Sequence, residues 1–359
     1  MLHFLYTPYL FKKGSYRRYE AANDEIVKYA RRYFETVTPV HLTHFNASRV
    51  TIRPEDILLG HPTWDSAYNI VDKNHVVVND WVRDNALSPD QPCHPNTYIY
   101  MPWLPFFASE THMPFAESQL ESARLIFANC GAYWYDQTMQ LPETTIQGRV
   151  KSKLVRVDMG CAGHLFPYKT KFKKGPRRNL FHVSNLGPAK NMALMVKSIE
   201  GLDLDLFVAS GSFAQAGVVE ARVKNLDGTT QMHTFHSLGP ISNSDAKTNA
   251  FIVDNMDFYL HTSRYDAQAT AIIENCARGL VPLISPESGF ACPHAVMLTQ
   301  DAERNREIIS KAVQMPASEY AERSQGVREY ILKYHNWHRI YARIWQKIQE
   351  DLKGKPSRQ

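Results

Sequence analysis

The stretch SRYDAQATAIIENCARGLVPLIS, residues 263–285, decides the fold of this chain. Two acids, Asp266 and Glu274, stand eight positions apart around small residues, and Gly279 and an apolar run follow them. This order predicts the end of a strand, a helix that begins near Ala267 and ends at the glycine, and a second buried strand. The acids have two interpretations: an N-capped helix with a charge on its exposed face, or two groups that bind opposite ends of one long polar ligand.

The same alternation of strands and helices extends through the whole chain. In the second half, strand-like apolar runs lie at 180–185, 204–210, 231–239 and 256–263, and helical spacing at 190–202 and 244–255, where Ser244 is the candidate cap. In the first half, strand-like runs lie at 2–6, 56–61, 75–79, 96–103, 123–130 and 153–160, and helical spacing at 16–34 and 117–123. This alternation predicts an α/β fold with mostly parallel, doubly wound sheets.

The domain organisation follows from two such halves. The segment PYKTKFKKGPRRN, 167–179, is polar and basic, so it predicts a linker or a solvated loop. We expect an N-terminal domain over 1–168 and a C-terminal domain over 169–337, with a ligand cleft between them. The tail 319–352 is expected to be helical throughout, and a helix over about 338–359 to return to the N-domain. Its apolar stripe consists of Trp337, Ile340, Ile344, Trp345 and Ile348.

Composition excludes several classes of protein. With 359 residues, 44% hydrophobic, the chain can bury a full core, and its net charge of +5 is too small for a dedicated nucleic-acid binder. Its five cysteines form no CxxC pair, which favours a reducing compartment over a disulfide framework or zinc site. The first apolar run precedes the lysines, the reverse of a signal peptide. We therefore expect a cytoplasmic protein.

Basic runs leave one further alternative open. They are Lys12, Lys13, Arg17, Arg18 and the segment 169–178. Such runs are usually solvated faces, but they also suit weak contact with an anionic acceptor or with the inner membrane surface.

A helix that begins just after Asp266 would present unpaired N–H groups and a partial positive charge, which suit a phosphate. The two acids would lie roughly 10 Å apart along the helix axis, too far to share a proton or a small substrate. They suit a ligand with a diphosphate in the middle and hydroxyl-rich groups at both ends, as in a nucleotide sugar.

The sequence resembles the retaining GT-B glycosyltransferases of the family-4 type. The resemblance is carried by the acid-x7-Glu spacing of Asp266 and Glu274, and by the segments HVSNLGPAKNM, HSLGPISNSDAKTNAFIVDNMDFYLHTS, KLVRVDMGCAGHLF and YHNWHRIYARIW. It covers residues 150–345 well and the first 150 weakly. It implies two Rossmann-like domains and a nucleotide-sugar-dependent transferase that needs no bound metal.

The resemblance also implies roles for individual residues. Glu274 would bind the ribose hydroxyls and Asp266 the donor sugar. Lys190 would bind the diphosphate, with the loop at Gly14 and the helix start at Ala267, Ala269 and Thr270. Lys190 also suits this role on physical grounds, because a flexible cation opposite a helix start stabilises the charge of a leaving diphosphate.

The sequence departs from the family pattern in several places. Asp266 replaces the usual Glu, and Asn185 replaces an arginine in the phosphate-binding segment. The catalytic histidine of the N-domain is absent near YMPW, so His61 is the candidate for that role and His112 a weaker substitute. His233 and His236 would face opposite sides of a strand, which disfavours a metal pair.

Three functions remain open at this point. The first is sugar transfer from a nucleoside diphosphate sugar to a glycan, lipid-linked or small-molecule acceptor, with retention through front-face substitution. The second is a nucleotide-sugar epimerase or hydrolase, for which the sequence offers no convincing acid/base set. The third is a catalytically silent nucleotide-sugar-binding protein. The sequence fixes neither the base, the sugar nor the acceptor.

Overall fold

The computed structural model describes residues 1–6, 29–41, 53, 55–60, 95–106, 120–172, 178–184, 186–211, 216–224 and 229–354. Contacts divide the chain into two compact units. The first comprises Met1–Cys130, Tyr135–Val157 and Trp337–Gln359, and the second Gly131–Trp134 and Asp158–Asn336. The domain limits expected from the sequence stay a prediction.

The first unit is built on a parallel sheet with the strand order β2-β1-β3-β4-β5-β6. Its strands are β1 (Leu2–Tyr6), β2 (Val37–His41), β3 (Ile57–Gly60), β4 (Thr97–Pro102), β5 (Leu125–Asn129) and β6 (Leu154–Val157), and helices α5 (Ala132–Met139) and α6 (Ile146–Val150) lie between β5 and β6 in the chain. The sequence did not predict β2, because Pro39 interrupts it. Proline is tolerated there because β2 lies at the edge of the sheet formed by the described strands.

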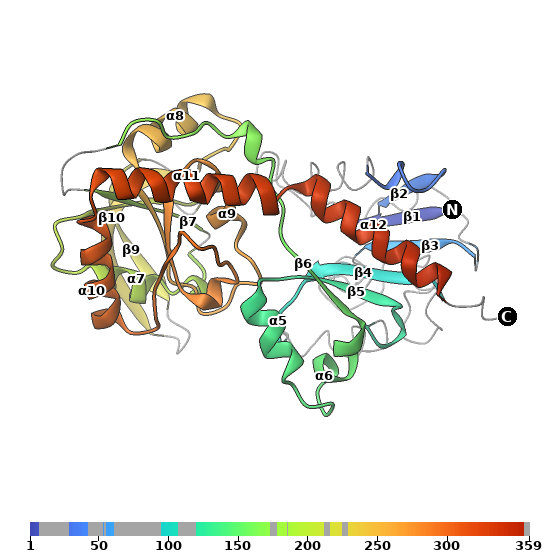
Figure 1. Ribbon diagram of the computed structural model, residues 1–359. Helices are drawn as coiled ribbons and strands as arrows, with labels where there is room; N and C mark the ends of the chain where they lie inside the picture. Colours follow the sequence, from blue (N-terminus) through green and yellow to red (C-terminus); the bar gives the residue numbers. More distant parts are fainter. Residues whose placement is uncertain are drawn as a thin grey trace. The chain divides into compact units, whose positions relative to one another are not determined.

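Helix α12 (Trp337–Lys353) belongs to the first unit and covers its sheet (Figure 1). Ile340, Ile344, Trp345 and Ile348 of the expected apolar stripe are buried in one cluster with sheet residues such as Leu2, Leu59 and Tyr98, and Trp337 packs partly buried against it. Its C-terminal turn is held by Asp351, whose Oδ2 accepts hydrogen bonds from Tyr98 Oη at 2.7 Å and Arg124 Nε at 2.5 Å.

The tail is not one continuous helix, as the sequence had suggested. Helix α11 (Ala317–Tyr334) has His335 as its C-cap, and α12 begins at Trp337. The His335 carbonyl accepts a hydrogen bond from Cys161 N at 2.8 Å, and the ring Nδ1 of His335 lies 2.8 Å from the Met159 carbonyl. The bond from Cys161 takes the place of a helical bond at the His335 carbonyl, and the ring contact holds the residue against the segment 159–161.

The second unit is built on a sheet with the strand order β13-β12-β11-β7-β8-β10-β9. All neighbours are parallel except β9 and β10. Its strands are β7 (Asn179–Val183), β8 (Asp205–Ala209), β9 (Ala216–Lys224), β10 (Thr230–Gly239), β11 (Phe258–His261), β12 (Val281–Ile284) and β13 (Val296–Met297). Its helices include α7 (Met192–Ile199), α8 (Ala246–Asn255), α9 (Thr270–Ala277), α10 (Ala302–Val313) and α11.

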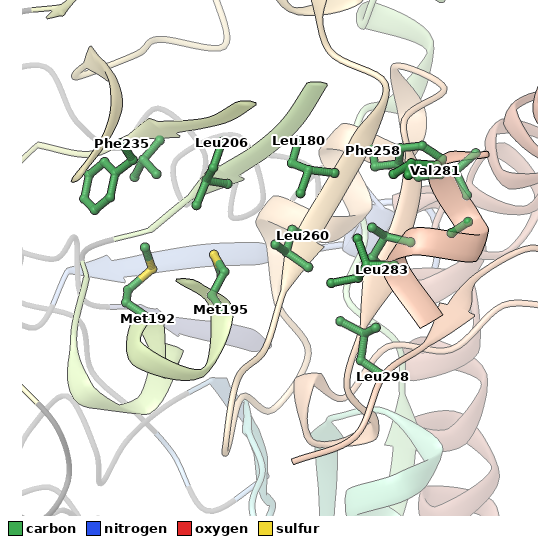
Figure 2. Packing of buried hydrophobic residues seen from close by; sticks show 14 of the residues in the cluster. Leu180, Met192, Met195, Leu206, Phe235, Phe258, Leu260, Val281, Leu283 and Leu298 are labelled. Carbon is green, nitrogen blue, oxygen red and sulfur yellow. The ribbon is translucent and has the colours of Figure 1, made fainter. Parts of the chain in front are cut away.

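The core of this unit forms between the sheet and its covering helices. Figure 2 shows Met192 and Met195 of α7 beneath Leu206 and Phe235 of the sheet. Burial of apolar side chains of this size stabilises the fold by roughly 1.5–3 kcal/mol each. The core therefore fixes where the loops after β7 and β11 begin.

The strand order creates a switch point between β7 and β11. From β7 the chain continues to β8 on one side, whereas β11 pairs with the other side of β7. Loops that leave the carboxyl ends of two such strands diverge and form a crevice, the usual place for a ligand in an open α/β sheet. Lys190 follows β7 and Asp266 follows β11, so this topology brings both candidate residues to one edge of the sheet.

In the segment 167–179, of which residues 173–177 lie outside the described ranges, two cations are not solvated as a linker or surface loop would have them. Lys169 is fully buried beside Asp257, and Arg178 is 2% exposed with its guanidinium over the ring of Tyr320 at 4.5 Å. The polar composition was misleading, because inside the second unit Lys169 pairs with Asp257 and Arg178 packs over the ring of Tyr320. The basic residues Lys12, Lys13, Arg17 and Arg18 lie outside the described residues.

Two helix starts also differ from expectation. Helix α8 is capped by Asp245, whose carboxylate accepts from the N–H groups of Lys247 and Thr248, and not by Ser244. Helix α9 begins at Thr270, three residues later than expected, and its Ala269 cap position provides no side-chain hydrogen bond. The backbone before it bonds to other segments, as described below.

Candidate functional site

The carboxyl ends of β7 and β11 bring Lys190 and Asp266 together. Nζ of Lys190 forms an ion pair and hydrogen bond with Oδ2 of Asp266. The two side chains are 21% and 19% exposed, so the pair remains accessible to a ligand. Burial raises the pKa of the Asp266 carboxyl, but the Lys190 charge and His261 outweigh it, and the pKa lies below its usual value. Asp266 is therefore ionised at neutral pH.

The two loops that carry this pair are bonded to each other. The carbonyl of Ala189 accepts hydrogen bonds from Ser263 Oγ and Arg264 N, both at 2.9 Å. The hydroxyl of Thr262 donates to the carbonyl of Asn191 at 3.1 Å. Asn191, directly after Lys190, has a left-handed backbone with φ of 51° and is the N-cap residue of α7. The geometry of the pair is thus fixed by backbone contacts on both sides.

Two buried histidines lie beneath the pair, one from each strand. His182 of β7 and His261 of β11 have ring centroids 5.4 Å apart, and Nε2 of His261 lies 3.5 Å from Oδ2 of Asp266. Burial holds the pKa of His182 well below its usual value, and burial likewise lowers that of His261. Both rings are neutral at neutral pH.

His182 connects strand β7 to the loop that carries Lys190. Its Nδ1 lies 2.9 Å from the carbonyl of Leu260, which only accepts, so the proton of the neutral ring is on Nδ1. Nε2 then accepts from the hydroxyl of Ser184 at 2.8 Å, and Ser184 Oγ accepts from Leu186 N at 3.1 Å. Leu186 has φ of 56°, and this chain of hydrogen bonds supports its left-handed backbone.

The backbone around Asp266 is held by a second set of contacts within the same unit. Asp266 N donates to the carbonyl of Glu287 at 2.9 Å, and Trp134 Nε1 donates to the carbonyl of Asp266 at 2.7 Å. Gly131 N donates to the carbonyl of Ala267 at 2.9 Å. A side chain at Gly289, which has φ of 69°, would overlap that same carbonyl. These bonds to other segments hold the N–H and carbonyl of Asp266 and the carbonyl of Ala267 in front of the helix.

Trp134 gives a prediction for this arrangement. We expect Trp134→Phe to lower stability by about 1–3 kcal/mol, because the carbonyls of Asp266 and Glu287 lose a buried donor. Activity is expected to fall about tenfold as well, since the Asp266 loop loses a constraint. Thermal unfolding and kcat would be measured together.

A matched control for this prediction is Trp103→Phe. Trp103 is also buried and donates through Nε1 to Thr138 Oγ1 at 3.1 Å, but it belongs to the first unit. It should lose similar stability with unchanged kcat. Equal kcat losses in both variants would contradict a specific role for Trp134.

Glu274 lies inside α9 and is buried, with 6% exposure, which contradicts the alternative of a charge on an exposed helix face. Burial raises the pKa of Tyr259 above its usual range, and the negative charges of Asp266 and Glu274 raise it further. Both carboxylates therefore lie within electrostatic reach of one tyrosine of β11.

The other predicted site residues have mixed outcomes. Gly14, His61, His112 and Asn185 lie outside the described residues, so their roles stay predictions. At the start of α9, Ala267 and Ala269 are buried and Thr270 is partly buried.

The N–H of Ala269 donates to the carbonyl of Ser288 at 3.2 Å and is occupied in this structure. The rest of the helix start stays a predicted phosphate site.

No metal site was found in the described ranges. Among these residues, no three His, Cys, Asp or Glu side chains gather as metal ligands would. His236 instead pairs with Asp205, with Nε2 3.3 Å from Oδ1. The expectation of metal-free chemistry stays a prediction. None of the described helices combines the length and apolar character that a membrane span requires.

Three residues of this site, His182, His261 and Trp134, were not predicted from the sequence. The two histidines stand at corresponding ends of neighbouring strands, and a polar side chain at the end of a buried strand was the available signal. Trp134 had no such signal, because its contact with Asp266 joins segments 132 positions apart.

Comparisons with known proteins identify the fold. No protein-family model and no curated protein sequence matches the chain. Among solved structures, it is similar to WaaG, a glycosyltransferase involved in lipopolysaccharide biosynthesis, at 10% identity and a TM-score of 0.57, with 97% of this chain and 99% of that chain covered.

Two further solved structures are similar over nearly the whole chain. One is Anabaena Alr3699/HepE in complex with UDP and glucose, at 12% identity and a TM-score of 0.59, with 99% of both chains covered. The other is a trehalose-6-phosphate structure from E. coli bound with UDP-2-fluoro glucose, at 12% identity and a TM-score of 0.60, with 97% and 99% covered. The predicted α/β fold of the GT-B type is confirmed.

Proposed function

We propose that this protein is a retaining glycosyltransferase that uses a nucleoside diphosphate sugar. The observation that carries the proposal is the accessible Lys190–Asp266 pair at the switch point between β7 and β11, with Glu274 buried in the helix α9 that follows Asp266. The similar structures with bound UDP and glucose, or UDP-2-fluoro glucose, support a UDP-sugar as the first donor to test.

In the proposed complex, the donor separates the ion pair. Nζ of Lys190 binds the diphosphate, Asp266 accepts a hydrogen bond from a hydroxyl of the donor sugar, and Glu274 accepts from the ribose. The start of α9, with Ala267, Ala269 and Thr270 around it, faces the diphosphate, and Gly14 and Asn185 contribute from outside the described residues.

In the reaction, the bond between the anomeric carbon and the phosphate oxygen breaks as the acceptor oxygen bonds to the same face of that carbon. The acceptor proton passes to the leaving phosphate oxygen, and the Lys190 cation stabilises the charge that develops there. His61 is the proposed N-domain contact to the sugar. The acceptor is a glycan, a lipid-linked saccharide or a small molecule, and the protein works in the cytoplasm or at the inner membrane surface.

A panel of UDP-, GDP- and ADP-sugars tests the function. We expect nucleotide release that rises with a saccharide or lipid-linked acceptor, and an α-linked product from an α-linked donor. Release without acceptor would indicate a hydrolase, and binding without turnover a silent nucleotide-sugar-binding protein. A β-linked product would contradict retention.

Glu274 provides a more specific prediction. Glu274→Gln is expected to raise the donor KM about tenfold to hundredfold with little change in kcat, because ribose contacts are the same in the ground state and the transition state. Steady-state kinetics with the selected donor measures this. Glu322→Gln, an exposed position on α11, is the control and should change neither constant. A fall in kcat at constant KM would contradict the ribose assignment.

A further inference from the structure

His261 has an environment that the fold alone does not explain. Its side chain is 1% exposed, and neither ring nitrogen has a hydrogen-bond partner among the described residues. A buried polar group without a partner loses its hydration without compensation, so such groups are rare in native structures. The Asp266 Oδ2 atom, 3.5 Å from Nε2, is too far for a good N–H···O bond. The ring thus lies next to the proposed sugar-binding carboxylate without a hydrogen bond to it.

The charges around the ring determine its protonation. Asp266 and Lys190 lie beside it, and the uncharged rings of His182 and Tyr259 pack against it with centroids 5.4 Å and 6.0 Å away. Burial lowers the pKa of His261 and the Lys190 cation lowers it further, against the opposite effect of Asp266. A neutral imidazole carries one N–H, and a carboxylate only accepts. Only the tautomer with its proton on Nε2 can therefore bond to Asp266.

We propose that His261 is a positioning residue for Asp266 in the donor-bound protein, an inference that rests on the proposed function. When the donor diphosphate draws Nζ of Lys190 away, Asp266 loses the cation that neutralises it. The Nε2–H of His261 then donates to Oδ2, closes the 3.5 Å gap and keeps the carboxylate ionised and directed at the donor sugar.

A positioning role of His261 predicts different effects in the free protein and in the donor complex, whereas a purely structural role predicts the same effect in both. In the free protein Lys190 still bonds to Asp266, whereas in the donor complex His261 would be its remaining charge-stabilising partner within this cluster. Loss of the Nε2–H donor should therefore raise the pKa of Asp266 mainly in the complex. The acidic limb of the kcat profile reports the complex, and that of kcat/KM reports the free protein. The kcat limb should move to higher pH by more than the kcat/KM limb.

The test compares two substitutions of similar polarity. His261→Gln places an amide donor near the position of Nε2, whereas His261→Asn is shorter and places its amide near Nδ1. We expect the Asn variant to lose about tenfold to hundredfold in kcat at pH 7, with the acidic limb shifted upward, and the Gln variant to stay within about threefold of the wild type. His236→Asn, beside Asp205 on another strand, is the control.

A second measurement does not depend on turnover. Long-range ¹H–¹⁵N NMR of histidine-labelled protein reports the tautomer of each ring, and His261 is assigned by the signal lost in His261→Gln. We expect the proton on Nε2. If the wild type transfers sugar normally but His261 carries its proton on Nδ1, the inference is wrong and the proposed function is unaffected. Equal rates for the Asn and Gln variants would have the same meaning. Absence of transfer by the wild type would contradict the proposed function and this inference with it.

Discussion

Lys190→Met is expected to lower kcat for sugar transfer by about 10²–10³-fold, the usual effect of removing a donor that stabilises charge in the transition state. The loss should appear in kcat more than in KM, because the negative charge on the departing diphosphate is greatest as the sugar bond breaks. Steady-state kinetics over a range of donor concentrations measures both constants.

Two further variants sharpen this prediction. Lys190→Arg keeps the cation, and we expect it to retain more activity than Lys190→Met, although a planar guanidinium binds phosphate differently from an ammonium. Lys197→Met removes an exposed cation from α7, the helix that follows Lys190, and should leave kcat unchanged. Similar rates for the Lys190 and Lys197 variants would show that Lys190 is not part of the reaction.

Lys169→Met is expected to destabilise the second unit by about 3–5 kcal/mol, the usual cost of breaking a buried ion pair on one side. Nζ of Lys169 lies 3.4 Å from Asp257 Oδ1, and both side chains are fully buried. It also donates to the carbonyls of Val253 at 3.0 Å and Met256 at 2.9 Å. Substitution leaves a buried carboxylate without its cation at the start of β11.

Thermal unfolding measures this effect, and we expect the midpoint of the second unit to fall by about 10 °C. Lys171→Met is the matched control, because Lys171 is exposed and two residues away in the same basic segment. Its midpoint should change by no more than about 1–2 °C. A fall of similar size in both variants would contradict the structural role of the buried pair.

The sequence predicted most strands of both sheets and several helices, because buried parallel strands are short apolar runs between turns. It missed β9, although Val219, Ala221 and Val223 alternate with polar residues there in the period of a strand. It also extended the tail helix through His335, because helical spacing continues on both sides of the break. Local patterns do not report bonds to distant segments such as the one from Cys161.

The candidate site was predictable only in part. Lys190 and Asp266 were identified separately, from a motif and from helix chemistry, but nothing in the sequence indicated that they form an ion pair across 76 positions. The late start of α9 was also hidden, because the bonds of 266–269 to Glu287, Ser288 and Gly131 depend on tertiary structure. The roles of Gly14, His61 and Asn185 remain predictions.

The most direct test of the account is a crystal structure of the protein grown with a nucleoside diphosphate. We predict that the diphosphate binds at the start of α9 within hydrogen-bond distance of Nζ of Lys190, that the ribose hydroxyls lie on Glu274, and that the Lys190–Asp266 bond is broken. A nucleotide bound elsewhere, with the Lys190–Asp266 pair intact, would contradict the central claim.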